Sequence, residues 1–404
     1  MKAPSGEGAV ELPPALPAPP GVAERSALAP GLGPPPPRPL WALLRGILSP
    51  LALVVGLLAL VLFSPLIGPE RLPPLQVLSI LLHQSTAGAL GGTACNGSVA
   101  PSQCRIWVEI VWDARVPAVL LAVLVGASLG LSGAGLQGLF RNSLADPFLL
   151  GLSAGAALGA AAAFTVTLSP GGSSVAATLL PTDPALLLPT AAFLGGLVPG
   201  SVVLLASYGR YRSPQTLLLT GIALNALFSA ILSTMLLYYP GINLQLTFWL
   251  LGGFPYATWS NDGLVLSVLI VAGLLLVLHG RPLNLLQMGE DVAQSLGIDP
   301  RRVARRVMLL ATVATAVAVA FAGIVGFVGL VSPHVVRRFV GVDYRRVLPL
   351  SMVAGAGFLL IAWDAAETVI PAAVIPVGIP TAFVGSSFFL YLLQRRPPPS
   401  ERGA

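Results

Sequence analysis

Long apolar runs, separated by short polar loops, dominate the chain from residue 41 onward. A helix needs roughly 20 apolar residues to cross about 30 Å of hydrocarbon, and runs of this kind recur along the chain. The pattern therefore predicts an all-α, polytopic membrane protein with about ten spanning helices. The predicted spans cover residues 47–67, 116–138, 148–168, 186–205, 217–238, 264–278, 307–325, the shorter 330–339, 347–363 and 379–393.

The polar segments divide the chain into a helical domain, residues 41–396, and two tails. Residues 1–40 are rich in Pro, Ala and Gly, a composition typical of a disordered tail, and residues 397–404 form a short second tail. Between the first two spans, residues 68–115 are predicted to be rich in loops. The most strongly charged stretch is 281–306, between the sixth and seventh spans.

The stretch 281–306 carries the signals of a short helix, a break and a second helix. Glu290 and Asp291 fall in the first turn, where the helix dipole favours anions. Gly297 is a C-terminal stop, and Asp299 followed by Pro300 begins the next helix. These signals predict a rigid helical elbow on which another chain can dock.

Charge distribution gives the orientation. The mean hydropathy is +0.84 and 55% of residues are hydrophobic, as in a membrane protein. Of the 22 Lys and Arg residues, only Arg71, Arg105 and Arg115 would lie outside if the N-terminus is cytoplasmic. The positive-inside rule therefore predicts cytoplasmic N- and C-termini and a cytoplasmic elbow. Because the arginines lie in short loops between spans, the net charge of +6 does not indicate nucleic-acid binding.

The chain lacks the residues for ATP hydrolysis. A phosphate-binding loop of the G-x-x-x-x-G-K-[ST] type needs a lysine, and Lys2 is the only one present. If ATP drives this protein, a partner supplies the site. The three histidines and two cysteines form no ligand cluster in the sequence, so no metal site is predicted. Cys95 and Cys104 share the loop-rich outer segment, where they form either a disulfide or two free thiols.

The predicted spans contain almost no charge, which argues against an ion-coupled transporter. The polar residues available for a translocation pathway are uncharged, and each also fits an ordinary interhelical contact. They are Gln137, Asn142, Thr220 and Asn225. Glycines at helix-contact spacing in 126–130 and 151–159 favour packing seams inside one bundle over a dimer interface.

Four segments, in this order, resemble the FecCD-type permeases of bacterial ABC importers for ferric siderophores, haem and cobalamin. They are GASLGLSGAGLQGLFRNSLADPFLLGLSAGAALG at 126–159, LNLLQMGEDVAQSLGID at 283–299, AGIVGFVGLVSPHVVRR at 322–338 and IPVGIPTAFVGSSFF at 375–389. The resemblance implies a type II ABC importer permease fold in the bacterial inner membrane. It also implies a homodimer, two cytoplasmic ATPase subunits that carry ATP and Mg²⁺, and a periplasmic or lipoprotein substrate-binding protein.

The resemblance assigns the elbow to coupling with the ATPase. In this family the corresponding element sits in a cleft of the ATPase, and movement there rocks the spans between inward- and outward-facing states. The candidate coupling residues are Gly289, Glu290, Asp291, Val292, Ala293, Leu296, Gly297 and Asp299.

The outer face departs from the family pattern. Family members often carry R-L-P-R before the second span; here Arg115 is kept but Ala118 replaces the second arginine. Glu367 stands where a family arginine aligns. The candidate docking residues are Arg115, Glu109, Asp113 and Glu367. Because three of these four side chains are acidic, they favour a binding protein with basic or apolar contacts on at least one lobe. Glu109 and Asp113, with Arg105, recur every four residues and are expected on one face of an interfacial helix.

The leading function is therefore a non-enzymatic permease subunit of an ATP-driven importer for iron chelates, either a ferric siderophore or haem. The alternative is the same machine importing cobalamin. A secondary transporter that works without ATP is a third hypothesis. A membrane enzyme fits poorly, because the spans contain no acidic pair.

Overall fold

The computed structural model describes residues 40–85, 95, 99–180, 183–207, 214–255, 257–370 and 374–394. Both expected tails, apart from Leu40, lie outside these residues. The chain divides into two units, Met1–Leu44 and Arg45–Ala404, and the packing described below is that of the second. The described residues form helices and turns without a strand, which confirms the all-α prediction.

Each predicted span lies on a helix. Within the described residues, six helices are long and apolar enough to cross a membrane, and three apolar helical stretches are shorter: Pro50–Leu66, Leu152–Leu168 and Gly378–Leu392. The expected run at 330–339 lies on α15 (Val328–Val340), whose 13 residues extend about 20 Å. That length is less than a bilayer core. The other helices of this set are α2 (Leu40–Phe63), α5 (Val116–Phe140), α6 (Leu152–Leu168), α8 (Leu187–Ala206), α9 (Pro214–Tyr238), α11 (Trp259–Leu278), α14 (Pro300–Ala322), α16 (Tyr344–Thr368) and α17 (Gly378–Gln394).

The segment 68–115 holds more helix than its composition predicts. It contains α3 (Pro74–Ser85) and α4 (Pro101–Val108), and π-helical turns at Glu109–Arg115 join α4 to α5. The result is one 40-residue helix, Pro101–Phe140. The helix expected before the second span is therefore continuous with that span. Arg105 still pairs with Glu109 at 3.3 Å, but the wider π turns change the register before Asp113.

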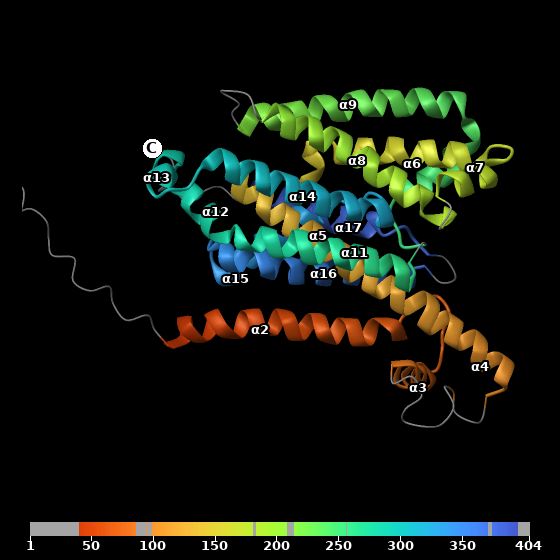
Figure 1. Ribbon diagram of the computed structural model, residues 1–404. Helices are drawn as coiled ribbons and strands as arrows, with labels where there is room; N and C mark the ends of the chain where they lie inside the picture. The colour runs from red at the N-terminus through yellow and green to blue at the C-terminus, as the bar shows by residue number, and fades with distance from the viewer. Residues whose placement is uncertain are drawn as a thin grey trace, which may run out of the picture. The chain divides into compact units, whose positions relative to one another are not determined.

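The second unit is built around α5. This helix packs against α16, α14, α15 and α11, while α6 packs against α8 and α9 (Figure 1). Helix α14 joins the two groups because it contacts both α5 and α8. The short helices α12 (Gly280–Gln287) and α13 (Glu290–Ser295) lie at one end of the bundle, and α4 and α7 (Gly172–Leu179) lie at the other.

Glycines allow the helix backbones to approach closely at two seams. A Cβ placed on Gly355 of α16 would lie 2.2 Å from the carbonyl oxygen of Gly126 on α5, closer than real Cβ atoms come. The pair Gly155 and Gly195 joins α6 to α8 in the same way, at 2.3 Å. Both seams lie inside one chain, which confirms the intrachain interpretation of the glycine spacing.

The α5–α16 seam gives a stability prediction. Gly355→Ala forces a methyl group onto the backbone of α5, and such overpacking costs about 1–3 kcal/mol. We expect a lower thermal unfolding midpoint in detergent, measured by fluorescence-detected size exclusion. Gly357→Ala is the matched control on the same helix, because its Cβ would meet only Leu60 Cδ1, at 3.9 Å. Equal midpoints for the two variants would contradict the close contact.

Candidate functional site

The elbow consists of α12, α13 and the start of α14, and the predicted sequence signals operate as expected. Gly289, at φ +123°, precedes α13, and Gly297, at φ +80°, follows it. Gly297 N–H donates to the Gln294 carbonyl and Ile298 N–H to the Ala293 carbonyl, both at 2.9 Å. This is the Schellman pattern, which satisfies the last carbonyls of a helix.

The second helix of the elbow has a side-chain cap. Asp299 Oδ1 accepts hydrogen bonds from the backbone N–H groups of Arg301 and Arg302, at 3.0 and 3.3 Å. Pro300 follows at the first helical position, where its fixed φ suits the helix. The direction in which the chain leaves the elbow is therefore fixed by local bonds.

Hydrogen bonds attach α12 to the ends of α5 and α16. The amide of Asn284 donates to Asp343 Oδ1 at 2.6 Å and accepts from Tyr344 N–H at 2.8 Å. Gln287 Nε2 donates to the carbonyl of Gly138 at 2.7 Å. The hydrogen bond from Asn284 lowers the pKa of Asp343. The backbone N–H of Arg345 and the positive charges of Arg345 and Arg346 lower it too, so the carboxylate stays charged. The elbow is thus attached to two long helices.

An apolar base lies under the elbow, and an apolar face lies on its outside. Leu283 and Ala293 are buried in a cluster with Val347 and Leu348 of α16. Ala293 is fully buried, so it supports the elbow from inside and cannot be a contact for a second chain; that expectation was wrong. Three apolar side chains remain exposed on the outside: Met288 at 67%, Val292 at 39% and Leu296 at 59%.

The charged side chains of the elbow face solvent. Glu290, Asp291 and Asp299 are exposed. Glu290 lies 3.9 Å from Arg141, which follows α5, and Arg302 pairs with Asp299 at 3.0 Å. Exposed pairs of this kind contribute little stability, so these charges remain available to a partner.

Arg115 does not lie where the docking hypothesis needs it. Its side chain is 7% exposed, and it donates to the carbonyl oxygens of Pro65 and Glu70. The guanidinium also fills the space beside Gly68, where a Cβ would meet it at 2.5 Å. Arg115 therefore holds the segment after α2 against the start of α5, and its assignment as a docking contact was wrong. Short-range sequence does not reveal this, because the partner carbonyls lie about 50 residues away.

Two of the three acidic docking candidates, Asp113 and Glu367, share a cavity with Arg115. Glu109 and Asp113 are exposed, and Glu367 on α16 is half-buried. Asp113, Arg115, Glu367 and Glu70 line a cavity of about 440 Å³. This outer region thus presents three carboxylates around one inward-turned guanidinium.

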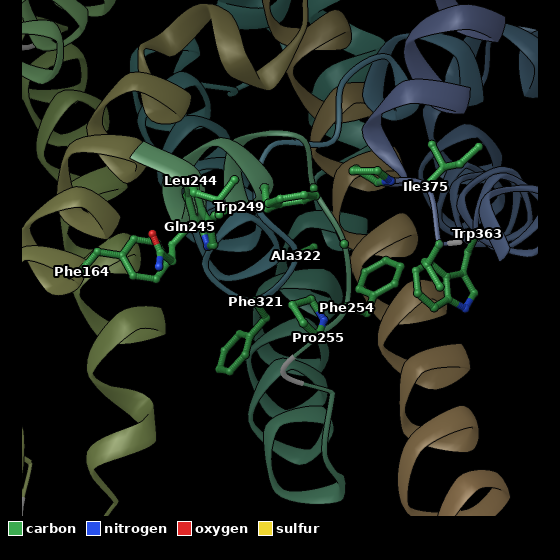
Figure 2. Close-up of a pocket in the computed structure, with 15 residues that line it drawn as sticks. Phe164, Leu244, Gln245, Trp249, Phe254, Pro255, Phe321, Ala322, Trp363 and Ile375 are labelled. Atoms are coloured by element: carbon green, nitrogen blue, oxygen red, sulfur yellow. The ribbon is translucent and has the colours of Figure 1, made fainter. Parts of the chain in front are cut away.

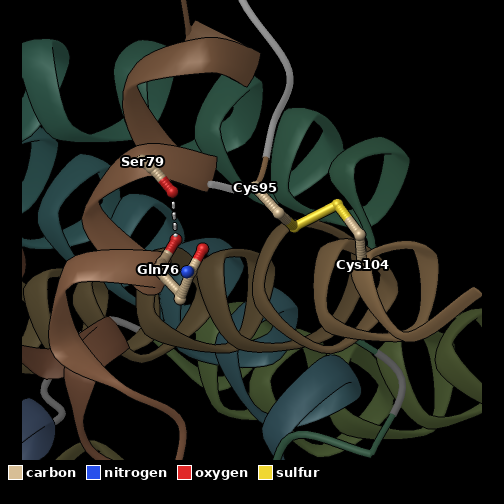
Figure 3. The surroundings of a disulfide bond; sticks show 4 residues. All are labelled: Gln76, Ser79, Cys95 and Cys104. Atoms are coloured by element: carbon tan, nitrogen blue, oxygen red, sulfur yellow. Dashed lines mark hydrogen bonds between the residues drawn. A yellow bond between two sulfur atoms is a disulfide. The ribbon is translucent and has the colours of Figure 1, made fainter. Parts of the chain in front are cut away.

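A disulfide braces the segment next to this cavity. Cys95 and Cys104 are bonded, which settles the alternative left open by the sequence (Figure 3). Cys95 is buried beside Val77 and Ile80 of α3, and Cys104 lies on α4. The bond therefore ties the first turns of the long helix to a residue that packs against α3.

The four pathway candidates lie in two pairs: Asn142 N–H donates to the Gln137 carbonyl at 3.2 Å at the end of α5, and Thr220 and Asn225 lie on α9. Gln137 is 1% exposed and donates to the carbonyl of Gly329 at 3.2 Å, so it joins α5 to α15 and its pathway role was wrong. Asn142 caps a turn by accepting from Leu144 N–H. Thr220 bonds to the carbonyl of Thr216 within α9, and Asn225 lies on the same helix. None of the four lines the largely apolar cavity described next.

A cavity of about 500 Å³ lies beside α10 (Asn243–Leu250). It is lined by residues from α6, α10, the 252–255 segment and the ends of α14 and α16, including Phe164, Trp249, Phe254, Phe321 and Trp363 (Figure 2). Sequence reasoning missed it because its aromatic residues are far apart in the chain. The sequence signal that could have pointed to it is the break Gly252-Gly253 after an aromatic helix.

The buried position of Arg115 gives a prediction. Arg115→Ala leaves two carbonyls and the nearby Glu367 without a cation, and a hydrogen bond to a charged group contributes about 1.5–3 kcal/mol. We expect a lower thermal midpoint in the isolated permease. Arg105→Ala is the control, because that side chain is 83% exposed and its loss should change little. If Arg115→Ala instead left the thermal midpoint unchanged and weakened the affinity of the permease for its binding protein, Arg115 would have a docking role.

Comparisons with known proteins agree with this architecture. The family model of the FecCD transport family matches residues 56–395. The hemin transport system permease protein HmuU of Yersinia pestis is 37% identical over 331 residues, covering 80% of this chain and 94% of that protein. The cobalamin import system permease protein BtuC of Halobacterium salinarum is 40% identical over 290 residues, covering 71% of this chain and 74% of that protein. A solved ABC transporter described as of metal-chelate type, in an inward-facing conformation, matches with a TM-score of 0.65 and 28% identity, over 84% of this chain and 98% of that one. The chain therefore belongs to the FecCD transport family and is an ABC transporter permease.

Proposed function

We propose that this chain is the membrane-spanning subunit of an ATP-driven importer for iron chelates, a ferric siderophore or haem. The observation that carries the proposal is the elbow. It presents three exposed apolar side chains, Met288, Val292 and Leu296, and it is attached to α5 and α16 through Asn284 and Gln287. A device of this kind transmits force, because its local bonds resist bending.

The ATPase would be a separate subunit, since the chain has no lysine beyond Lys2 for a phosphate-binding loop. ATP and Mg²⁺ would be bound there, and two ATPase copies would serve a homodimer of this chain. Closure of the ATPase pair would push the two elbows together. Because each elbow is attached to α5 and α16, the push would tilt these helices and switch access from one side to the other. The side chains proposed to meet the ATPase are Glu290, Asp291, Val292 and Leu296, while Gly289, Gly297 and Asp299 shape the elbow.

Orientation follows from the arginine distribution. The elbow and both termini would face the cytoplasm of a bacterial cell, with the chain in the inner membrane. The cavity beside α10 would then open toward the outside, where a substrate-binding protein delivers cargo.

The choice of cargo rests on relatives. The Yersinia relative is named for hemin and the solved neighbour for metal chelates, which supports an iron chelate. The relatives named for cobalamin support the alternative of the same machine importing cobalamin. A secondary transporter is the third hypothesis, and a requirement for ATP excludes it.

The binding protein would carry basic or apolar contacts on at least one lobe. With Arg115 turned inward, the outer charges left for docking include the carboxylates of Glu70, Glu109, Asp113 and Glu367, together with exposed Arg105 and Arg71. A cognate binding protein that carries a glutamate on each lobe and docks through Arg115 would contradict this.

Leu296→Asp tests the elbow. The new carboxylate would disrupt an apolar contact between the elbow and the ATPase. Loss of a central interface contact typically costs about 2 kcal/mol, or roughly a 30-fold loss of affinity for the ATPase. We expect ATPase co-purification and ATP-driven uptake to fall together in proteoliposomes.

Val342→Asp is the matched control, the same kind of change at a 74% exposed residue beside Asp343 but outside the elbow. Uptake that survives Leu296→Asp and continues without ATP would overturn the ABC assignment.

A further inference from the structure

Helix α3, Pro74–Ser85, exposes a row of three leucine side chains. Leu75, Leu78 and Leu82 are 76%, 51% and 51% exposed. Positions i, i+3 and i+7 follow one side of a helix, so the three side chains form a continuous apolar strip, called here the leucine row. A strip of this kind on an exposed helix marks a surface that contacts a partner or a lipid.

The two other sides of α3 differ from the leucine row and from each other. Val77 and Ile80 are fully buried and pack in a cluster with Val111 of the long helix. Between this buried side and the leucine row lies a polar row of Gln76, Ser79 and His83, again at positions i, i+3 and i+7. Ser79 Oγ donates to the Gln76 carbonyl at 2.9 Å (Figure 3). A protein side, a polar side and an apolar side are what a helix needs at a membrane surface beside a protein.

Tryptophans mark the level of α3 along the bundle. Helix α3 packs against the π-helical turns Glu109–Arg115, which carry Trp112. The ring of Trp112 lies 4.9 Å from that of Trp259, the first residue of α11, and α11 ends next to the elbow. Because tryptophan is enriched where spanning helices meet the headgroups, the start of α11 lies at the membrane surface opposite the elbow. Helix α3 therefore lies at headgroup level.

Helix α3 lies across the bundle. Its 12 residues extend about 18 Å, which is too short to cross a bilayer. Figure 1 shows α3 nearly end-on at the tip of α2, while α2 and α5 run across the picture. It packs against the turn Ser64–Leu66, which directly follows α2. The leucine row thus lies close to the exposed apolar end of α2, at Leu58, Leu62 and Phe63, and continues the surface that this helix presents to lipid.

We propose that α3 is a membrane-surface anchor. It lies in the headgroup region of the leaflet opposite the elbow, with the leucine row among the acyl chains and the polar row toward water. A soluble partner would approach from the side of the polar row, so lipid is the occupant that the leucine row fits. Through its buried side the anchor holds the disulfide-braced segment and the first turns of the long helix at a fixed depth.

Single introduced cysteines measure the depth of each side of α3. The two native cysteines are bonded to each other, so monobromobimane, used without reductant, labels the introduced thiol alone. Leu78→Cys and Leu82→Cys place the label on the leucine row. Ser79→Cys and His83→Cys are their matched controls, because each is the next residue along the chain but lies about 100° further around the helix.

The labelled permease is placed in phospholipid nanodiscs with two quenchers. One is a phospholipid that carries a nitroxide near the top of an acyl chain, and the other is iodide in the water. Exposed Leu62 on α2 gives the reference for lipid contact, and exposed Gln294 in the elbow gives the reference for water. We expect the lipid nitroxide to lower the emission at Leu78 and Leu82, and iodide to lower it at Ser79 and His83. This alternation cannot come from the affinity of the label for lipid, since all sites carry the same label.

Iodide quenching at Leu78 and Leu82 equal to that at Gln294 would overturn the inference. Protection of both sites from both quenchers would also overturn it, because a second copy of the chain would then cover the row. So would iodide quenching that is lost only when the purified cognate binding protein is added, since the row would then be a docking surface for that protein.

A second measurement tests the anchoring itself. The double variant Leu75→Gln with Leu78→Gln changes two exposed side chains, so the thermal midpoint in detergent should stay close to that of the wild type. In nanodiscs, the weakened row should rise toward water, and a label at Leu82 should lose quenching by the lipid nitroxide and gain quenching by iodide. An unchanged ratio of the two would contradict the anchor. Neither measurement uses ATP or cargo, so their outcome is independent of the import function.

Discussion

Direct backbone contact between α5 and α16 is the constraint on which the rest of this structure depends. Gly126 and Gly130 on one helix face Gly355 and Ser351 on the other, with no room for a Cβ between them. In lipid, where burial of apolar surface gives little drive for helix association, such contact supplies dispersion and fixed geometry. The two helices therefore behave as one rigid pair, and features at either end of the pair are mechanically linked.

The elbow is attached to one end of this pair and the aromatic cavity adjoins the other. Asn284 and Gln287 connect the elbow to residues at the ends of α16 and α5, and the ring of Trp363 on α16 lines the cavity. Arg115 joins the outer start of α5 to the segment after α2. A push on the elbow thus has a continuous path along α5 and α16 to the opposite end of the bundle.

Much of this was predictable where the determining chemistry is local. The apolar runs gave the helices, and Gly297, Asp299 and Pro300 gave the elbow, since capping depends on residues a few positions apart. Burial depends on partners far along the chain. The sequence therefore could not predict that Arg115 turns inward or that Gln137 bonds to the Gly329 carbonyl. The same holds for Ala293 and for the cavity, whose aromatic residues come from four helices and a connecting segment. The π turns at Glu109–Arg115 have no clear sequence signature.

The central claim, that the elbow moves as one body with α5 and α16, can be measured by spin-label distances across the homodimer. The two cysteines of the chain are bonded to each other, so a single introduced cysteine gives one distance between copies. Labels at exposed Gln294 in the elbow and, separately, at exposed Val342 before α16 report the two parts. The account predicts that ATP binding by the complete importer changes both distances in the same direction. A change at Gln294 with no change at Val342 would mean that the elbow swings independently, and would contradict it.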